Sequence, residues 1–228
     1  MATAAPTATS TATPPMPIDP RLLTLTQWLS PAYPVGAFAW SHGLESAVRQ
    51  GWVTDEVSLQ SWLTDILAEG SGKADALWIR LAWQGDRSVA ELDALARAWQ
   101  PSRERLREAE RQGTAFVQVT AEVWDLDLPP MLLPVALGEA ARQMDMSVEP
   151  VAALYLQSFA GNLVSAAQRL MPLGQTAAQG VLARLAPLCA ELAAGTEGLT
   201  LEDMASCAYL SDVASMKHET LEPRLFQS

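Results

Sequence analysis

The chain has 228 residues, enough for one large domain or two small ones. It contains 38 alanines and 32 leucines against 3 isoleucines, and aromatic residues make up 7% of it. Alanine and leucine are strong helix formers, whereas β-branched and aromatic residues are typical of strands. The composition therefore argues against a β-sandwich or barrel and predicts an all-α fold.

The charge balance limits the kinds of partner. The 26 acidic residues outnumber the 15 basic ones, which gives a net charge of −11. A field of this sign repels phosphate backbones and anionic lipid headgroups, so we expect no nucleic-acid partner and no membrane association. The two cysteines, Cys189 and Cys207, cannot build a disulfide framework, which favours a cytoplasmic location.

Three parts of the chain differ in composition. Residues 1–20 are rich in Ala, Thr and Pro, lack the features of a signal peptide, and predict a disordered leader. Residues 21–220 predict a single-domain bundle of about ten helices, because the halves on either side of the proline pair at 129–130 are too small to cover their own apolar faces. Residues 221–228 form a tail that cannot extend the last helix, and we expect it to be loose in the free protein.

The helical part begins with a helix that stops before Pro31. Residues 31–40, PAYPVGAFAW, contain two prolines and a glycine and predict an irregular connector. A short helix with Ser41 as its N-cap and Gly51 at its end should follow. Further helices are expected over residues 55–69, 74–84, 89–99, 102–124, 131–143, 149–170, 174–194 and 202–215.

Glycines and capping pairs mark several of these boundaries. Gly70 and Gly72 are expected to end the helix over residues 55–69. Ser88 with Glu91 and Thr200 with Asp203 have the spacing at which a hydroxyl and an acid cap a helix start reciprocally. These two pairs predict helix starts just after residues 88 and 200.

No motif for nucleotide binding or nucleophilic catalysis is complete. GSGK at residues 70–73 lacks the second glycine and the following Ser or Thr of a phosphate loop, because Leu67 and Ala74 occupy those positions. The run WSHG at residues 40–43 lacks the glycine that a serine nucleophile elbow requires two residues before Ser41. We therefore expect no catalytic residue and no bound cofactor, and we expect that the chain is not an enzyme.

Metal binding is limited by the number of ligands, since the chain has two histidines and two cysteines. No pair of them is closely spaced, so we expect no metal site within one chain, although half of a site shared with another chain remains open. His42 and Glu45 are three residues apart on one helical face, where a hydrogen bond at the surface is the favoured interpretation.

A cluster of charged residues follows position 102. Arg and Glu alternate at one-turn spacings such as Glu104 with Arg107 and Glu108 with Arg111, which favours a solvated, self-neutralising helix face. The alternative is a docking face for an acidic partner. The cluster consists of Arg103, Glu104, Arg105, Arg107, Glu108, Glu110 and Arg111.

Four stretches resemble the urease accessory protein UreF family. They are SPAYPVGAFAWSHGLESAVRQGWV at residues 30–53, SRERLREAERQGTAF at 102–116, LMPLGQTAAQ at 170–179 and SMKHETLEPRLFQS at 215–228. The last is the most specific, with His-Glu-Thr followed by Arg-Leu-Phe-x-Ser. The resemblance extends from about residue 22 to residue 228.

The resemblance implies a non-enzymatic, dimeric maturation factor for urease. Such a factor would join the nickel-carrying GTPase UreG and the accessory protein UreD, also called UreH, on apo-urease, and would couple GTP hydrolysis to nickel insertion. A generic helical scaffold without a nickel role is the alternative that composition alone leaves open. A helical hydrolase or metalloenzyme is disfavoured by the small number of histidines.

Two surfaces are expected to bind these partners. On the UreD/UreH side, the tail offers an Arg fork for a carboxylate and two apolar residues for a groove. The residues expected there are His218, Glu219, Arg224, Leu225, Phe226 and Ser228. On the GTPase side, the connector offers loop aromatics, for which a role in the core is an equally favoured interpretation. The residues expected there are Pro34, Gly36, Phe38, Trp40 and Glu45.

Overall fold

A computed structural model describes residues 18–228, so nearly all of the predicted leader lies outside the described residues. The described part contains ten α-helices, two 3-10 helices and no strand, which confirms the all-α fold. The α-helices are α1 (Pro20–Trp28), α2 (Leu44–Arg49), α3 (Glu56–Glu69), α4 (Ser71–Gln84), α5 (Val89–Ala98), α6 (Arg103–Trp124), α7 (Leu133–Gln143), α8 (Val148–Leu170), α9 (Gln175–Ala194) and α10 (Tyr209–His218). The 3-10 helices are η1 (Ala37–Ala39) and η2 (Leu201–Asp203).

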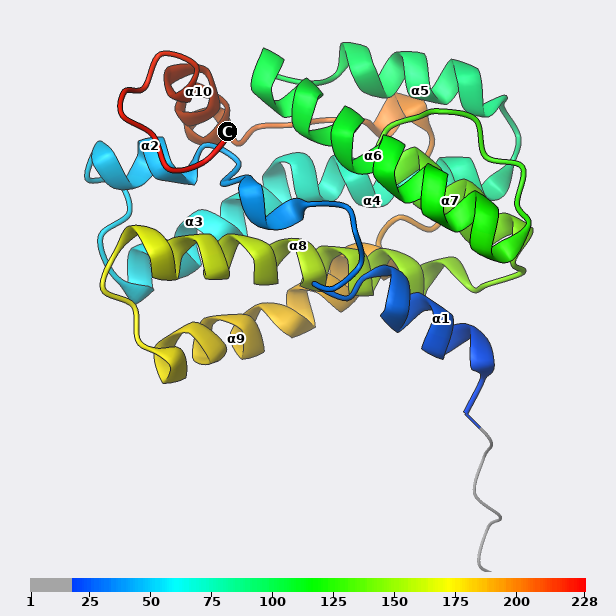
Figure 1. Ribbon diagram of the computed structural model, residues 1–228, viewed down its shortest axis with the longest axis horizontal. Coiled ribbons are helices and arrows are strands. Elements are labelled where there is room, and N and C mark those ends of the chain that lie inside the picture. The colour runs from blue at the N-terminus through cyan, green and yellow to red at the C-terminus, as the bar shows by residue number, and fades with distance from the viewer. Residues whose placement is uncertain (1–17) are drawn as a thin grey trace, which may run out of the picture.

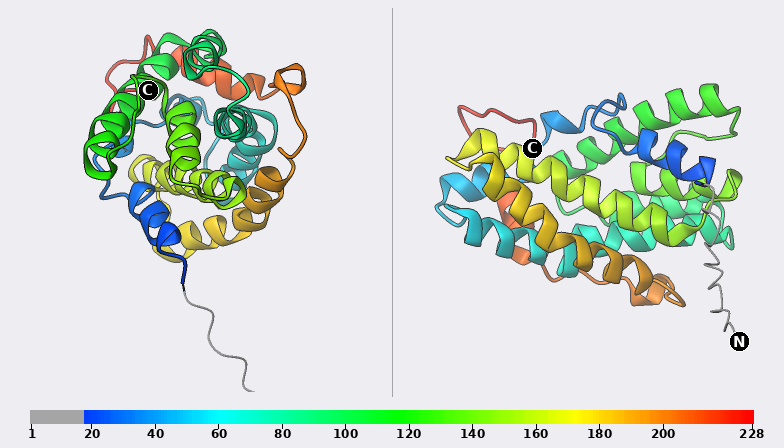
Figure 2. Two further views of the ribbon diagram at one scale, coloured as in Figure 1. Left: turned by 90° about the vertical axis from the view of Figure 1, so that its right-hand side faces the viewer. Right: turned by 90° about the horizontal axis from the view of Figure 1, so that it is seen from below.

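Helix α7 is the centre of the bundle. All its residues from 134 to 141 are buried, and it packs against α4, α6 and α8. The other long helices surround it, as the end-on view in Figure 2 shows. Helices α8 and α9 form an antiparallel pair on one side, and α2 and α10 lie together at one end of the molecule (Figure 1). A single core cluster runs from Leu25 in α1 to Phe226 in the tail.

Most helix bounds agree with the sequence prediction to within one or two residues. The predicted helix over residues 202–215 is confirmed over residues 209–215, which lie in α10, but is wrong before them. The chain makes only the short η2, and residues 204–208 are irregular before α10 begins at Tyr209. The amides of Cys207 and Ala208 both donate to the carbonyl of Glu69, at 2.7 and 3.2 Å, which holds this segment across the end of α3. A tertiary contact thus overrides the local helix propensity of the segment.

The glycines at residues 70–72 divide two helices that follow each other directly. Gly70 ends α3, and a Cβ there would lie 2.8 Å from the Cβ of Ala208. Gly72, expected to be a helix terminator, lies inside α4, where a Cβ would lie 2.7 Å from the Cα of Leu67. The prediction for Gly72 is wrong because close packing between α3 and α4, and not helix termination, requires this glycine.

The predicted caps are only partly present. Thr200 and Asp203 form the reciprocal capping box, whereas Ser88 accepts from the amide of Glu91 while the Glu91 carboxylate pairs with Arg87. The prediction of Ser41 as N-cap of α2 is wrong, because Gly43 holds that position with φ +78°. A Cβ at Gly43 would lie 2.6 Å from the amide nitrogen of Ser215, so this glycine lets α2 and α10 approach closely.

Within residues 18–228, none of the helices combines the length and the apolarity that crossing a bilayer requires.

The close packing of α7 gives a test of the fold. A Cβ at Gly138 would lie 2.3 Å from the carbonyl oxygen of Ile79 in α4. We expect Gly138→Ala to lower the free energy of unfolding by about 1–3 kcal/mol, because backbone must move. Gly161→Ala in α8 is the matched control: nothing lies within 4 Å of its Cβ position, and alanine should stabilise the helix by about 0.5–1 kcal/mol. Urea denaturation checks both values, and equal effects at the two glycines would contradict this packing.

Candidate functional site

The C-terminal tail is folded against the helical domain. After α10 the chain turns back and runs past α2, as the red segment in Figure 1 shows. Phe226 is 3% exposed and Ser228 is fully buried. The expectation of a loose tail is therefore wrong for this structure, and the reason is a set of buried acidic side chains in α2 and α6 that the tail contacts.

Glu45 on α2 accepts hydrogen bonds from the backbone of the tail. Its carboxylate lies 2.8 Å from the amide nitrogen of Leu225 and 2.9 Å from that of Phe226. Burial alone would raise the pKa of Glu45, but these two amides and His218 bring it below its ordinary value. Glu45 was expected on the GTPase side, whereas its carboxylate faces the tail.

His218 lies between two carboxylates at the end of α10. Its Nδ1 is 2.7 Å from the Glu104 carboxylate and its Nε2 is 3.3 Å from the Glu45 carboxylate. The second oxygen of Glu104 pairs with Arg224 of the tail. Glu45 belongs to α2 and Glu104 to α6, so His218 connects α2, α6 and α10.

Glu108 and Ser41 fix the end of the tail. The Ser228 hydroxyl donates to Glu108 over 3.0 Å, and Arg105 forms an ion pair with the same carboxylate. The Ser228 carbonyl oxygen accepts from the amide of Ser41 at 2.9 Å and from its hydroxyl. Glu45, Glu104 and Glu108 are thus three buried carboxylates that bind the tail, and together they form the tail seat.

The charged cluster after position 102 is not the solvated face that the sequence favours. Glu104, Arg105 and Glu108 are buried, between 5% and 7% exposed. The expected one-turn pairs do not form: Glu104 bonds to His218 and Arg224, and Arg111 bonds to Gln227. The reason is that α6 packs against α10 and the tail. Glu104 is therefore matched by these segments, while Glu108 pairs with Arg105 on α6 and also accepts from Ser228 of the tail.

A second polar group lies deeper in the same region. Tyr155 donates to the Asp75 carboxyl over 2.7 Å, and both are buried. Burial raises the pKa of Asp75 to about 6, although the Tyr155 hydrogen bond and the Arg105 charge oppose the shift. His42 is also buried and pairs with the Ser71 hydroxyl at 2.8 Å, so the expected surface contact with Glu45 is wrong. Burial, with the charge of Arg105, puts the pKa of His42 well below its usual value.

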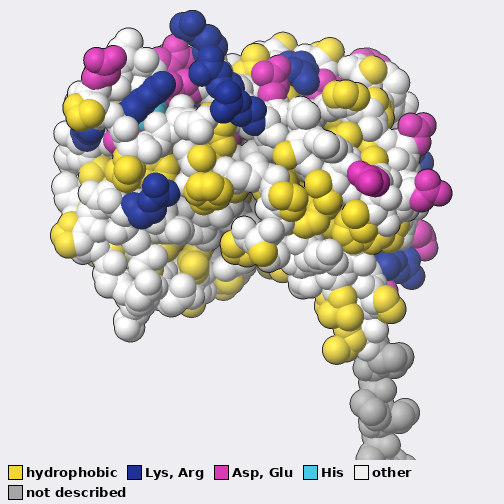
Figure 3. Space-filling model, in the orientation of Figure 1, with side chains coloured by type: hydrophobic (Ala, Val, Ile, Leu, Met, Phe, Trp, Pro, Cys, Tyr) yellow, Lys and Arg dark blue, Asp and Glu magenta, His cyan; other side chains and the backbone are white. Residues whose placement is uncertain are grey.

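Arginines surround the tail on the outside. Figure 3 shows basic side chains gathered on this face toward the end that carries α10 and the tail. Arg49 donates to the carbonyls of Glu222 and Pro223, and the Arg169 guanidinium lies 4.2 Å from the centre of the Phe226 ring. The exposed arginines of the helical domain with contacts to residues 219–228 are Arg49, Arg103, Arg111 and Arg169, and the tail itself carries the exposed Arg224.

The connector and the tail are joined. The amide of Gln227 donates to the carbonyl of Ala39 over 2.9 Å, and Arg169 donates to the carbonyl of Phe38 over 2.9 Å while its guanidinium covers Phe226. The two surfaces that the sequence suggests as separate are therefore neighbours connected by backbone hydrogen bonds.

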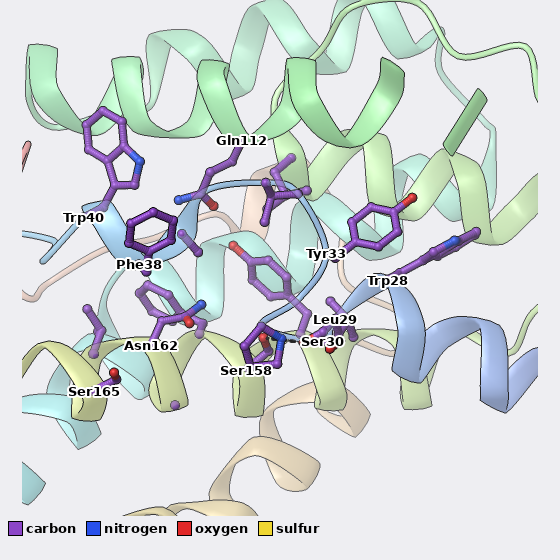
Figure 4. Close-up of a pocket in the computed structure, with 18 of the residues that line it drawn as sticks. Trp28, Leu29, Ser30, Tyr33, Phe38, Trp40, Gln112, Ser158, Asn162 and Ser165 are labelled. Atoms are coloured by element: carbon purple, nitrogen blue, oxygen red, sulfur yellow. Dashed lines mark hydrogen bonds between the residues drawn. The ribbon is translucent and has the colours of Figure 1, made fainter. Parts of the chain in front are cut away.

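A cleft of about 400 Å³ lies beside the connector, between α6 and α8 (Figure 4). Polar side chains of α8, among them Ser158 and Asn162, line one wall, and Gln112 of α6 faces them across the opening. Phe38 is 74% exposed at the rim, whereas Trp40 is 4% exposed and packs inside. Of the three connector aromatics, Phe38 alone has a ring free to touch another protein, because Tyr33 is also buried.

Two further connector residues shape its exposed edge. Pro34 is exposed. Gly36 has φ +71°, and nothing lies within 4 Å of its Cβ position, so it is the left-handed backbone and not crowding that favours glycine there. Within residues 18–228, no three or more His, Cys, Asp or Glu side chains are grouped in a way that could hold a metal ion.

Comparison with known proteins agrees with the resemblance. The UreF family model matches residues 53–186. The urease accessory protein UreF of Cereibacter sphaeroides (strain KD131 / KCTC 12085) is 51% identical over 207 residues, which cover 91% of this chain and 98% of that protein. The UreF of Ruegeria pomeroyi is 43% identical over 214 residues, 93% and 99% of the two chains. The chain belongs to the UreF family. This membership implies a role in urease maturation.

Three of the four segments by which this UreF-family chain resembles its family meet in space. The tail, the connector and the first turns of α6 all contribute to the tail seat and its surroundings. Sequence reasoning missed Ser41, Arg105, Glu108 and Arg169 as residues that hold the tail. The acids at 104 and 108, one turn apart beside Arg105, were visible, but only the fold shows that they face inward.

The buried Asp75 gives a prediction on pH. Because its folded pKa of about 6 is above the ordinary 3.8, the carboxyl favours folding while it is protonated, and this contribution is lost as pH rises from about 4 through about 6. Asp75→Asn keeps an acceptor for Tyr155 and has no charge to bury. We expect it to gain stability relative to the wild type across that range, by on the order of 1–3 kcal/mol.

Urea denaturation at several pH values measures this difference. Asp65→Asn, at an exposed position on α3, is the matched control for exchanging an acid for an amide. A constant difference between Asp75→Asn and wild type from pH 4 to pH 7 would show that Asp75 ionises without cost in the folded chain.

Proposed function

We propose that this chain bridges a UreG-type GTPase and a UreD/UreH-type accessory protein on apo-urease and couples GTP hydrolysis to nickel insertion. The observation that carries the proposal is the direct connection between the two exposed docking elements, the connector and the tail, through the Gln227–Ala39 hydrogen bond and through Arg169. A bridging factor needs two binding surfaces that can influence each other. The maturation role of the UreF family supplies the context.

The UreD/UreH-type protein binds the tail and α10 in this proposal. Leu225 is 55% exposed even though its amide bonds to Glu45, so the tail presents this side chain outward. Helix α10 adds an exposed apolar face formed by Tyr209, Leu210, Val213 and Met216. An apolar surface of this kind on a chain with net charge −11 suits a protein partner. Phe226, His218 and Ser228 act indirectly, because they are buried and hold the tail in place.

Charge adds selectivity at this end. Although the whole chain is acidic, exposed arginines surround the tail, and Glu219 is occupied by Arg103. Exposed arginines beside apolar anchors favour a partner surface that carries carboxylates near its own apolar groove. This is the acidic partner that the charged cluster after position 102 suggests as an alternative, now shifted from α6 to the tail.

The GTPase binds the connector in this proposal. Phe38 and Pro34 are exposed, and the cleft beside them offers a concave, partly polar surface. Trp40 supports the connector from inside, and the Arg111 guanidinium lies 5.8 Å from the centre of its ring. Arg169 binds the Phe38 carbonyl and also covers Phe226. A partner that moves Arg169 at one surface therefore alters a contact of the other surface.

The remaining features of the proposal follow the family resemblance. The chain acts as a non-catalytic, cytoplasmic homodimer that receives both GTP and nickel chemistry from its partners. The tail seat supports a non-catalytic role, because the oxygens of its buried acids accept hydrogen bonds from the chain itself.

Leu225→Asp tests the tail surface. The substitution places a charge on an exposed side chain without touching the backbone hydrogen bonds to Glu45, so the fold should be unchanged. We expect at least about a tenfold loss of affinity for the UreD/UreH-type protein, typical of losing an apolar interface anchor. Val57→Asp on α3, at a position 77% exposed, is the matched control and should bind normally. Equal binding by both variants in a pull-down would contradict the assignment.

Phe38→Ala tests the connector surface. Because the ring is exposed, its removal should change the melting temperature little while weakening recruitment of the UreG-type GTPase by about tenfold or more. Co-purification with the GTPase, in the presence of the UreD/UreH-type protein, measures the effect. Recruitment at normal affinity would place the GTPase elsewhere on the chain.

Urease activation separates the bridging role from that of a generic scaffold. Apo-urease is supplied with nickel, GTP, the GTPase and the UreD/UreH-type protein, with or without this chain. We expect activity to depend on the chain, and expect both Leu225→Asp and Phe38→Ala to reduce it. Equal activation without the chain would overturn the proposed function.

A further inference from the structure

The cleft beside the connector has an aromatic lining. Phe159 stacks on Tyr155, with ring planes 9° apart and ring centres 6.4 Å apart, and both rings line the cleft together with Phe116 and Trp40. Rings of this kind bury apolar side chains of a bound molecule. The cleft volume of about 400 Å³ lies toward the lower end of the range for ligand pockets, so it holds a short segment and not a whole helix.

Polar side chains stand on two facing walls of the cleft. Ser158, Asn162 and Ser165 follow one another at helical spacing along α8, and all three line it. Gln112 of α6 faces this row (Figure 4), and since its Nε2 donates to Glu108, its oxygen is left as an acceptor.

This arrangement favours an extended polypeptide as the ligand. An extended segment has unpaired N–H and C=O groups along both of its edges, which amides and hydroxyls on facing walls can bind. A helix pairs its own backbone groups and docks by an apolar face into an apolar groove. The polar walls of the cleft therefore fit an extended segment better than a helix.

Two exposed arginines flank the end of the cleft that the connector forms. Arg169 donates to the Phe38 carbonyl over 2.9 Å. Arg111 lies 5.8 Å from the centre of the Trp40 ring and donates to the side-chain oxygen of Gln227. Both acceptors are uncharged, and in the described part of the chain neither guanidinium has a carboxylate partner, although the net charge is −11. Arginines left unmatched at this end favour a ligand that carries a carboxylate.

We propose that the cleft binds an extended segment of the protein that docks on the connector, with an Asp or Glu side chain of that segment against Arg111 and Arg169. The inference rests on the proposed function, in which that protein is the UreG-type GTPase. Glu108, which also lines the cleft, does not oppose this placement, because Arg105 pairs with its carboxylate. The backbone of the segment runs along the polar row of α8, and its acidic residue lies toward the tail.

Filling the cleft tests the inference. Gly161 lines the cleft, and nothing lies within 4 Å of its Cβ position, so Gly161→Leu adds a side chain in open space and also favours the helix. We expect this variant to bind the UreG-type GTPase about tenfold or more weakly, in the presence of the UreD/UreH-type protein. Ser61→Leu, at an exposed position on α3, is the matched control and should bind normally. Normal binding by Gly161→Leu would overturn the inference.

Charge reversal tests the acidic residue of the segment. Arg111→Glu should weaken GTPase binding by about tenfold or more, and Arg111→Gln, whose amide still reaches Gln227, should weaken it less. Arg87→Glu, between α4 and α5 and outside the cleft lining, makes the same change in net charge and is the matched control. Equal losses in Arg111→Glu and Arg87→Glu would overturn the assignment of a carboxylate to this site.

Photo-crosslinking identifies the segment itself. With p-benzoylphenylalanine in place of the exposed Ser165, in a purified mixture of this chain, the GTPase and the UreD/UreH-type protein, we expect the crosslink in a GTPase segment that contains Asp or Glu. A crosslink to the UreD/UreH-type protein, to a second copy of this chain or to a GTPase segment without an acid would overturn the inference.

The variants separate failure of this inference from failure of the proposed function. If Phe38→Ala loses the GTPase while Gly161→Leu and Arg111→Glu keep it, the connector is the docking surface and the assignment of the cleft is wrong. If all three bind the GTPase normally, both the cleft and the connector are wrong as its docking site.

Discussion

Three carboxylates buried where α2 and α6 meet the tail constrain one end of this molecule. Burying a charged group is unfavourable unless it is hydrogen-bonded or paired. The domain provides only part of what Glu45, Glu104 and Glu108 need, and the rest comes from the tail amides, Arg224 and Ser228. The last residues of the chain are therefore a structural part of the domain, although they contain no regular secondary structure.

This requirement explains neighbouring features that look unrelated in sequence. Gly43 lets α10 approach α2, which brings His218 between Glu45 and Glu104. The connector lies along the tail because of two backbone hydrogen bonds. The Ala39 carbonyl accepts from the amide of Gln227, and the Ser41 amide donates to the Ser228 carbonyl oxygen. The exposed side chains Phe38 and Leu225 then lie on two segments that are hydrogen-bonded to each other. Rigid presentation of two such anchors is what a protein that joins two partners requires.

The sequence predicted the helices well and the site only in part. Alanine-rich apolar spacing is local information, so α3 to α9 were placed correctly to within a few residues. The predicted helix over residues 202–215 is wrong before residue 209 because the shape of residues 204–208 depends on the distant Glu69 carbonyl. For a similar reason, the sequence predicts that Glu104 and Glu108 belong to a solvated helix face, which is wrong. Their inward orientation depends on α10 and the tail, which are more than 100 residues away along the chain.

The resemblance identified the tail and the connector, but their connection depends on tertiary contacts. Exposure separated Phe38 from Trp40, which composition and local pattern treat alike. The sequence suggests that Phe226 and His218 contact a partner directly. Both are buried, so they hold the tail in place instead. A sequence thus indicates which residues have a functional side chain more readily than whether that side chain is buried or exposed.

The most direct test of the dependence of the tail seat on the tail is a cycle of unfolding free energies with Glu45→Gln, in the full chain and in a chain ending at Glu222. In the full chain, weakening a charged acceptor of two amides should cost about 1–3 kcal/mol. In the shortened chain the carboxylate has lost those donors, so the same substitution should be neutral or stabilising. An equal loss of stability in both chains would contradict the account.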